Sequence, residues 1–160
     1  MDSSEVKPFA AYGRAMKDIR DKVYFQIHFG ANYETGTYGW TTNLDTVKRS
    51  VDWQLNALQT DYIDFGFIHC IDELADLHEV EKTGIIRYIE KLKEKGVVRH
   101  IGLSSHTPSL VNKVLDMGIL DMLMFSIDPS YDFAGGLEPN YAANNYAVGS
   151  VAERRKMCLL

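Results

Sequence analysis

Hydrophobic and polar positions follow two different periods along this chain. Four short runs are apolar or rich in β-branched and aromatic residues, a pattern typical of strands that are covered on both faces. Between these runs, apolar residues recur every three or four positions, which is the period of an amphipathic helix. The predicted strands are Lys22–Phe29, Tyr62–Cys70, Val97–Ser104 and Leu120–Ile127.

Predicted helices alternate with the strands. Gly13 interrupts the first of them, Thr42 and Asp45 give the second a start resembling a capping box, and Thr107 followed by Pro108 begins a later one. The predicted helices are Ala10–Arg20, Thr42–Gln59, Glu79–Lys95, the segment from Thr107 to Gly118 and a segment that begins at Val148, and Asp128–Asn145 is predicted to be a long loop.

This alternation, without hairpin signals, predicts right-handed crossovers and a parallel sheet. An open doubly wound sheet and a closed eight-stranded barrel would both fit. No GxGxxG follows a strand, which counts against the open sheet. Each strand instead ends in a polar residue, as barrel enzymes require; these residues are His28, His69, Ser104 with Ser105, and Ser126. Because a full barrel takes about 250 residues, residues 1–160 are predicted to form one partial α/β domain, a parallel TIM-type barrel of about four strands.

Composition excludes several classes of protein. Of the 160 residues, 46% are hydrophobic and 24% charged, which is ordinary for a globular domain. The net charge of -5 and the lack of a basic cluster exclude nucleic acid as a partner, and no apolar stretch or signal pattern suggests a membrane. Cys70 and Cys158 have no metal-binding spacing, so a reducing, cytoplasmic compartment is expected.

Four segments, in chain order, resemble the aldo-keto reductases. RDKVYFQIHFG (Arg20–Gly30) is similar to that family's third strand, LQTDYIDFGFIHCID (Leu58–Asp72) to its fourth and GVVRHIGLSSH (Gly96–His106) to its fifth. LDMLMFSIDPSYDF (Leu120–Phe133) resembles the sixth, most closely in the branch often fused to a ferredoxin-like 4Fe-4S module. The resemblance covers nearly the whole chain and implies the central portion of a (β/α)8 barrel.

The resemblance also implies a chemistry. The family reduces aldehydes or ketones with a nicotinamide cofactor, usually NADPH, through an Asp, Tyr, Lys and His set. His69 matches the histidine that orients the carbonyl, and His28 stands at the lysine position. The Asp and Tyr belong to a strand that would precede Ala10 and are not found in this chain. Ser104 and Ser105 match the pair that contacts the nicotinamide carboxamide; Ser126 is a further candidate cofactor residue, and no iron–sulfur cluster is expected in this chain.

Each candidate also has a structural interpretation. A histidine inside an apolar strand is often a buried, satisfied group, but the residues around His69 favour a substrate-site position. Ser104 and Ser105 could instead cap the helix that begins near Thr107. Asp64 is expected to be buried and hydrogen-bonded at the base of the barrel, in a stabilising role, and Asp72 to support the site from a loop.

The roles of three loop aromatics and one histidine stay open. Tyr33, Tyr38 and Trp40 follow the first strand, where they could line a substrate pocket or pack against one another. His106 lies next to the serine pair, with no role assigned.

Three functions are compared. The first is hydride transfer from NADPH, or NADH, to a small carbonyl substrate, by a chain that is truncated and therefore inactive or impaired. The second is a non-catalytic half-barrel module that self-associates through exposed sheet edges. The third, a metal-dependent hydrolase built on His28 and His69, is disfavoured because paired histidines and strand-end carboxylates are lacking.

Overall fold

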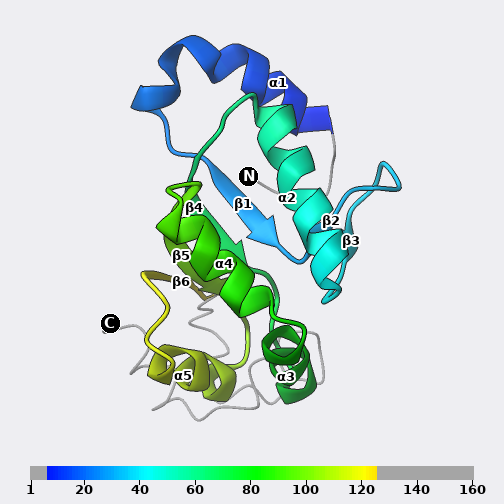
Figure 1. Ribbon diagram of the computed structural model, residues 1–160, viewed down its shortest axis with the longest axis vertical. Coiled ribbons are helices and arrows are strands. Elements are labelled where there is room, and N and C mark those ends of the chain that lie inside the picture. The colour runs from blue at the N-terminus through cyan, green and yellow to red at the C-terminus, as the bar shows by residue number, and fades with distance from the viewer. Residues whose placement is uncertain (1–6, 126–160) are drawn as a thin grey trace, which may run out of the picture.

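A computed structural model describes residues 7–125 of the chain (Figure 1). Its helices are α1 (Lys7–Met16), a 3₁₀ helix (Lys17–Lys22), α2 (Leu44–Leu58), α3 (Leu74–Lys82), α4 (Ile85–Glu94) and α5 (Pro108–Asp116), and its strands are β1 (Gln26–Phe29), β2 (Ala31–Asn32), β3 (Gly39–Trp40), β4 (Ile63–Ile68), β5 (Val98–Ser104) and β6 (Met122–Met124). Ser126 and the predicted loop and helix after it lie outside the described residues. Within residues 7–125, no helix combines the length and hydropathy needed to cross a membrane.

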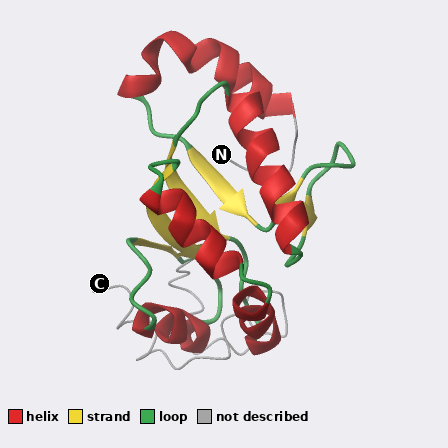
Figure 2. Ribbon diagram, in the orientation of Figure 1, coloured by secondary structure: helices red, strands yellow, loops and turns green. Residues whose placement is uncertain are grey.

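The four predicted strands form one parallel sheet. Its order is β1-β4-β5-β6, so neighbours in the sheet are also successive main strands along the chain. Figure 2 shows α4 lying in front of this sheet and α2 running beside β1, and both are crossover helices between parallel strands. The predicted parallel α/β architecture is therefore confirmed.

The two faces of the sheet differ in what they carry. Ile27 and Phe29 point toward the helices and belong to the main core, with Val47 and Val51 of α2. Because side chains alternate along a strand, His28 lies on the opposite face. The register aligns His28 with Phe67, Phe67 with Gly102, and Ser104 with Met124, so this second face holds the candidate polar residues.

A glycine makes room for an aromatic ring on this second face. A Cβ on Gly102 would lie 2.5 Å from the Phe67 ring. Phe67 is fully buried as a result, and its ring meets His28 edge-on at 6.3 Å. Phe67, packed closely against Gly102, thus lies beside His28 on this face of the sheet.

Two predicted helices differ from the observed ones. The single helix expected over Glu79–Lys95 is two helices, α3 and α4, because Gly84 between them adopts a left-handed conformation with a φ of 83°. The second helix is capped by Asn43, whose Oδ1 accepts the Thr46 N–H at 3.0 Å, so the capping box predicted from Thr42 and Asp45 is wrong.

A hairpin was not expected and is present. Strands β2 and β3 pair in antiparallel fashion between β1 and α2. Each strand has only two residues, too few for a recognisable alternation of polar and apolar positions. Tyr38 lies at the end of the hairpin loop, immediately before β3. The hairpin therefore lies at the carboxyl end of β1, beside the candidate site.

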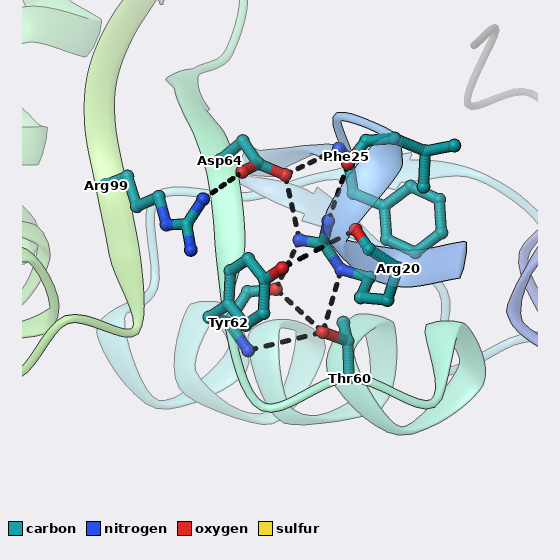
Figure 3. A network of polar contacts seen from close by, with 7 residues as sticks. Arg20, Phe25, Thr60, Tyr62, Asp64 and Arg99 are labelled. Atoms are coloured by element: carbon teal, nitrogen blue, oxygen red, sulfur yellow. Dashed lines mark hydrogen bonds and ion pairs between the residues drawn. The ribbon is translucent and has the colours of Figure 1, made fainter. Parts of the chain in front are cut away.

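A buried carboxylate joins the bases of three strands (Figure 3). Asp64 of β4 accepts hydrogen bonds from the Phe25 N–H at 2.9 Å, Arg20 at 2.8 Å and Arg99 at 3.0 Å. The Arg20 guanidinium also lies between the rings of Phe25 and Tyr62, 4.5 and 3.9 Å from their centroids. The predicted buried, hydrogen-bonded role of Asp64 is confirmed.

Candidate active site

The carboxyl ends of β1, β4 and β5 bring together residues that are far apart in the sequence. His28 lies near the end of β1, His69 directly follows β4, and Ser104 ends β5. The His28 and His69 rings stack with their centroids 4.3 Å apart and an interplanar angle of 13°. Parallel strands end at one edge, so the predicted candidates from these three strands share a single location.

His28 is held in place by its own backbone and by its neighbours. The buried Gln54 side chain of α2 accepts the His28 N–H at 3.3 Å and donates to the His28 carbonyl at 3.2 Å. Gln26 Nε2 donates to His28 Nε2 at 2.9 Å, which leaves the ring proton on Nδ1. Burial, with His69 as a second cause, lowers the pKa of His28 to about 3. His28 is therefore neutral at pH 7 and cannot supply the positive charge of a lysine.

His69 is held by the hairpin. Its Nε2 lies 2.8 Å from Tyr38 Oη, and its carbonyl accepts the Trp40 indole N–H at 3.0 Å. The Cys70 Sγ lies 3.5 Å from the same Nε2. Burial lowers the pKa of His69, so this ring is also neutral at pH 7. Two of the three loop aromatics, Tyr38 and Trp40, thus contact the candidate site.

The third loop aromatic packs elsewhere. Tyr33 stacks on Trp53 with ring centroids 5.0 Å apart and meets Phe9 at 5.2 Å. All three rings belong to or border the main core. The structure therefore shows aromatic packing for Tyr33, and lining of a substrate pocket by Tyr38 and Trp40 stays a prediction.

The two serines have different surroundings. Ser105 is buried, and its hydroxyl donates to the Ile71 carbonyl at 2.6 Å and lies 3.2 Å from Asp72 Oδ1. It also accepts the Thr107 N–H at 3.2 Å. These bonds tie the segment after β4 to the segment after β5. Ser104, which shares the face of His28 and Phe67, is the better placed of the two to meet a ligand.

Asp72 and His106 form a pair that the sequence did not reveal. Asp72 Oδ1 accepts the His106 N–H at 2.6 Å, and Oδ2 lies 2.9 Å from His106 Nδ1. The hydrogen bond from Asp72 raises the pKa of His106. Burial alone would raise the pKa of Asp72, but the hydrogen bonds from His106 lower it overall. The two residues are 34 positions apart, so no local pattern could have predicted the pairing.

This pair predicts a stability optimum in mildly acidic solution. The lowered pKa of Asp72 makes its contribution complete above its ordinary value of 3.8 and lost as the pH falls further. The raised pKa of His106 makes its contribution complete below 6.5 and lost as the pH rises through the folded-state value. The free energy of unfolding, measured with urea from pH 3 to 9, should be about 1 kcal/mol higher between pH 3.8 and 6.5 than outside this range. Asp72→Asn should flatten the profile; an unchanged profile in this variant would contradict the assignment.

Metal binding finds no support in residues 7–125. Within that range, no three His, Cys, Asp or Glu side chains are grouped closely enough to hold a metal ion. The two stacked histidines are each engaged by a neighbouring polar side chain, Gln26 for His28 and Tyr38 for His69. The hydrolase hypothesis therefore gains nothing from the described part of the chain.

Comparison with known proteins identifies the fold and its family. The model of the aldo/keto reductase family matches residues 6–134. The uncharacterized oxidoreductase YqkF of Bacillus subtilis is 27% identical over 121 residues, which cover 72% of this chain and 37% of that protein. Oxidoreductase YdhF of Escherichia coli is 31% identical over 107 residues, 62% of this chain and 34% of that protein.

A solved structure agrees with the sequence relatives. The holo form of an aldo-keto reductase from Bacillus halodurans superposes with a TM-score of 0.59 at 28% identity, covering 74% of this chain and 39% of that one. The chain spans about a third of the length of the two bacterial oxidoreductases. With a family match over most of its length and a parallel sheet that superposes on part of the barrel, the chain belongs to the aldo/keto reductase family.

Proposed function

We propose that this chain supplies the carbonyl-binding centre of an NAD(P)H-dependent oxidoreductase that reduces aldehydes or ketones. The observation that carries the proposal is the location of His69: it follows a central strand of the sheet, is hydrogen-bonded to Tyr38 and is stacked on His28. Membership of an oxidoreductase family supports the class of reaction. Since the chain spans a third of its relatives, this activity is proposed for the protein of which these strands form the centre.

The polar groups gathered here suit one end of the cofactor better than the other. His28, His69, Tyr38 and Ser104 are uncharged hydrogen-bonding groups, which match a substrate carbonyl and a nicotinamide carboxamide. None of these four side chains is cationic, so the cofactor's phosphates would need other residues. When bound, the reduced nicotinamide supplies the hydride, while this chain orients the carbonyl and holds the carboxamide through Ser104.

NADPH binding tests this proposal. Trp40 donates its indole N–H to His69, so its fluorescence should report a nicotinamide at the strand ends. Titrating the 160-residue chain with NADPH should give saturable quenching. Ser104→Ala should weaken binding about tenfold, the effect of about one lost hydrogen bond. Trp40→Phe removes the reporter and serves as the optical control. Absence of saturable binding both by this chain and by a version extended at both ends would refute the proposal.

Self-association is the second candidate, because of one specific feature. Met122 and Met124 of β6 are large apolar residues that remain exposed at the edge of the described sheet. The opposite edge is less available, since Gln54 already bonds the outward-facing backbone of His28 on β1. Light scattering distinguishes the candidates: a stable dimer that does not bind NADPH would favour the module, and a monomer that binds NADPH would exclude it.

A further inference from the structure

Asp72 and His106 join the segments that follow β4 and β5. Asp72 comes three residues after His69, and His106 comes two residues after Ser104. Asp72 Oδ1 accepts the His106 N–H at 2.6 Å, and Oδ2 lies 2.9 Å from His106 Nδ1. The Asp72 carbonyl also accepts the Thr107 hydroxyl at 2.8 Å. The pair is therefore built into the edge of the candidate site, with the Asp72 and His106 side chains 26% and 21% exposed.

His106 is the member of this pair whose charge changes near neutral pH. The hydrogen bond from Asp72 raises the pKa of His106. Burial alone would raise the pKa of Asp72, but the hydrogen bonds from His106 lower it overall, so the carboxylate is charged throughout this range. When His106 is protonated, the two charges of the pair cancel. When His106 is neutral, the pair carries the one negative charge of Asp72.

The other titratable groups that face the pair do not change their charge near neutral pH. His69 and Cys70 lie at the end of β4; burial lowers the pKa of His69 and raises the pKa of the Cys70 thiol, so both side chains are neutral at pH 7. Glu73 and Asp76, at the start of α3, contribute negative charge at that pH. The first turn of α5 has no charged residue. Among these described groups, His106 is the one that switches.

We propose that the Asp72–His106 pair sets the preference of the site between oxidised and reduced nicotinamide, through the one charge that His106 gains or loses. This inference rests on the function proposed above, in which Ser104 holds the carboxamide. The oxidised nicotinamide ring is positively charged and the reduced ring is neutral, whereas the rest of the cofactor is the same in both. With His106 protonated, the neutral pair favours neither ring. With His106 neutral, the uncompensated Asp72 carboxylate attracts the oxidised ring.

The position of the pair makes this attraction measurable. Asp72 Oδ1 lies 3.2 Å from the hydroxyl of Ser105, the residue next to Ser104. Charges closer together than the Debye length of about 8 Å are only partly screened, and in a half-buried site one such charge changes a binding constant by about fivefold. The phosphates bind equally in both forms of the cofactor, so the effect is isolated in the ratio of the two dissociation constants.

His106→Gln keeps a hydrogen-bonding side chain and removes the change of charge. The dissociation constants of NADP⁺ and NADPH are measured by fluorescence titration from about pH 5.5 to about pH 8.5, on this chain and on a version extended at both ends. In wild type, the NADP⁺ constant divided by the NADPH constant should fall about fivefold as the pH rises. In His106→Gln, this ratio should stay constant. His100→Gln is the matched control and should follow wild type, because His100 is exposed and lies near the amino-terminal end of β5.

A second readout uses the reciprocity of the two binding equilibria. Because NADP⁺ favours the neutral imidazole, NADP⁺ must lower the pKa of His106 when it binds, while NADPH leaves this pKa unchanged. An NMR titration of the His106 ring measures both effects. A wild-type ratio that does not change with pH, or one that still changes in His106→Gln, overturns this inference and leaves the proposed function standing. Binding of neither nucleotide by either version of the chain overturns both.

Discussion

Replacing Asp64 by alanine should lower the free energy of unfolding by about 3–5 kcal/mol, or leave the chain unfolded. The carboxylate side chain is 3% exposed, and it neutralises Arg20, whose side chain is only 11% exposed. Removing the acid leaves that guanidinium buried between two aromatic rings without its counter-charge. It also leaves the Phe25 N–H without its hydrogen-bond acceptor. Removing one partner of a buried pair costs far more than the pair itself contributes.

The other arginine on the same carboxylate provides the control. Arg99 binds Asp64 Oδ1 at 3.0 Å but is 53% exposed, so water can replace it. Arg99→Gln should therefore cost less than about 1 kcal/mol. Urea denaturation followed by circular dichroism measures both variants. Equal losses in Asp64→Ala and Arg99→Gln would mean that burial does not decide the strength of this network.

Strong local patterns made the strands predictable. The run around β4 is too apolar for a surface position and too short for a buried helix, and the glycine at position 96 separates the preceding helix from β5. Asp64 could also be assigned from sequence, because a carboxylate inside an apolar strand must find hydrogen-bond partners. Its partners could not, since Arg20 and Arg99 lie 44 and 35 residues away.

Only those site residues were predictable that could be inferred from a polar residue at the end of a predicted strand. His28, His69 and Ser104 follow from the rule that parallel strands deliver their ends to one edge. The contact between Tyr38 and His69 depends on a hairpin whose strands have two residues each, and no pattern of that length is informative. Ser105 differs for another reason: its hydroxyl is consumed by Ile71 and Asp72, which only the folded loops bring near.

Gly13 is a position where packing reverses the sign that helix propensity predicts. The sequence suggested that this glycine interrupts the first helix, but α1 runs through it from Lys7 to Met16. At Gly13, α1 crosses the end of α2 so closely that a Cβ would lie 2.8 Å from the Leu58 carbonyl carbon and against the Ala57 carbonyl oxygen. Backbone atoms on both helices meet there, so neither side can yield by a change of rotamer.

Helix propensity alone predicts that Gly13→Ala stabilises α1 by about 1 kcal/mol. The close contact predicts the opposite sign, because α1 must move away from α2 and loosen Phe9 from its contacts with Tyr33 and Trp53. We expect a net loss of about 2–3 kcal/mol, the cost of overpacking a tight contact. Ala15→Gly, at an exposed position of the same helix, should lose about 1 kcal/mol through propensity alone. Thermal and urea unfolding of the two variants separates the effects. A Gly13→Ala chain at least as stable as wild type would show that the two helices can part without cost.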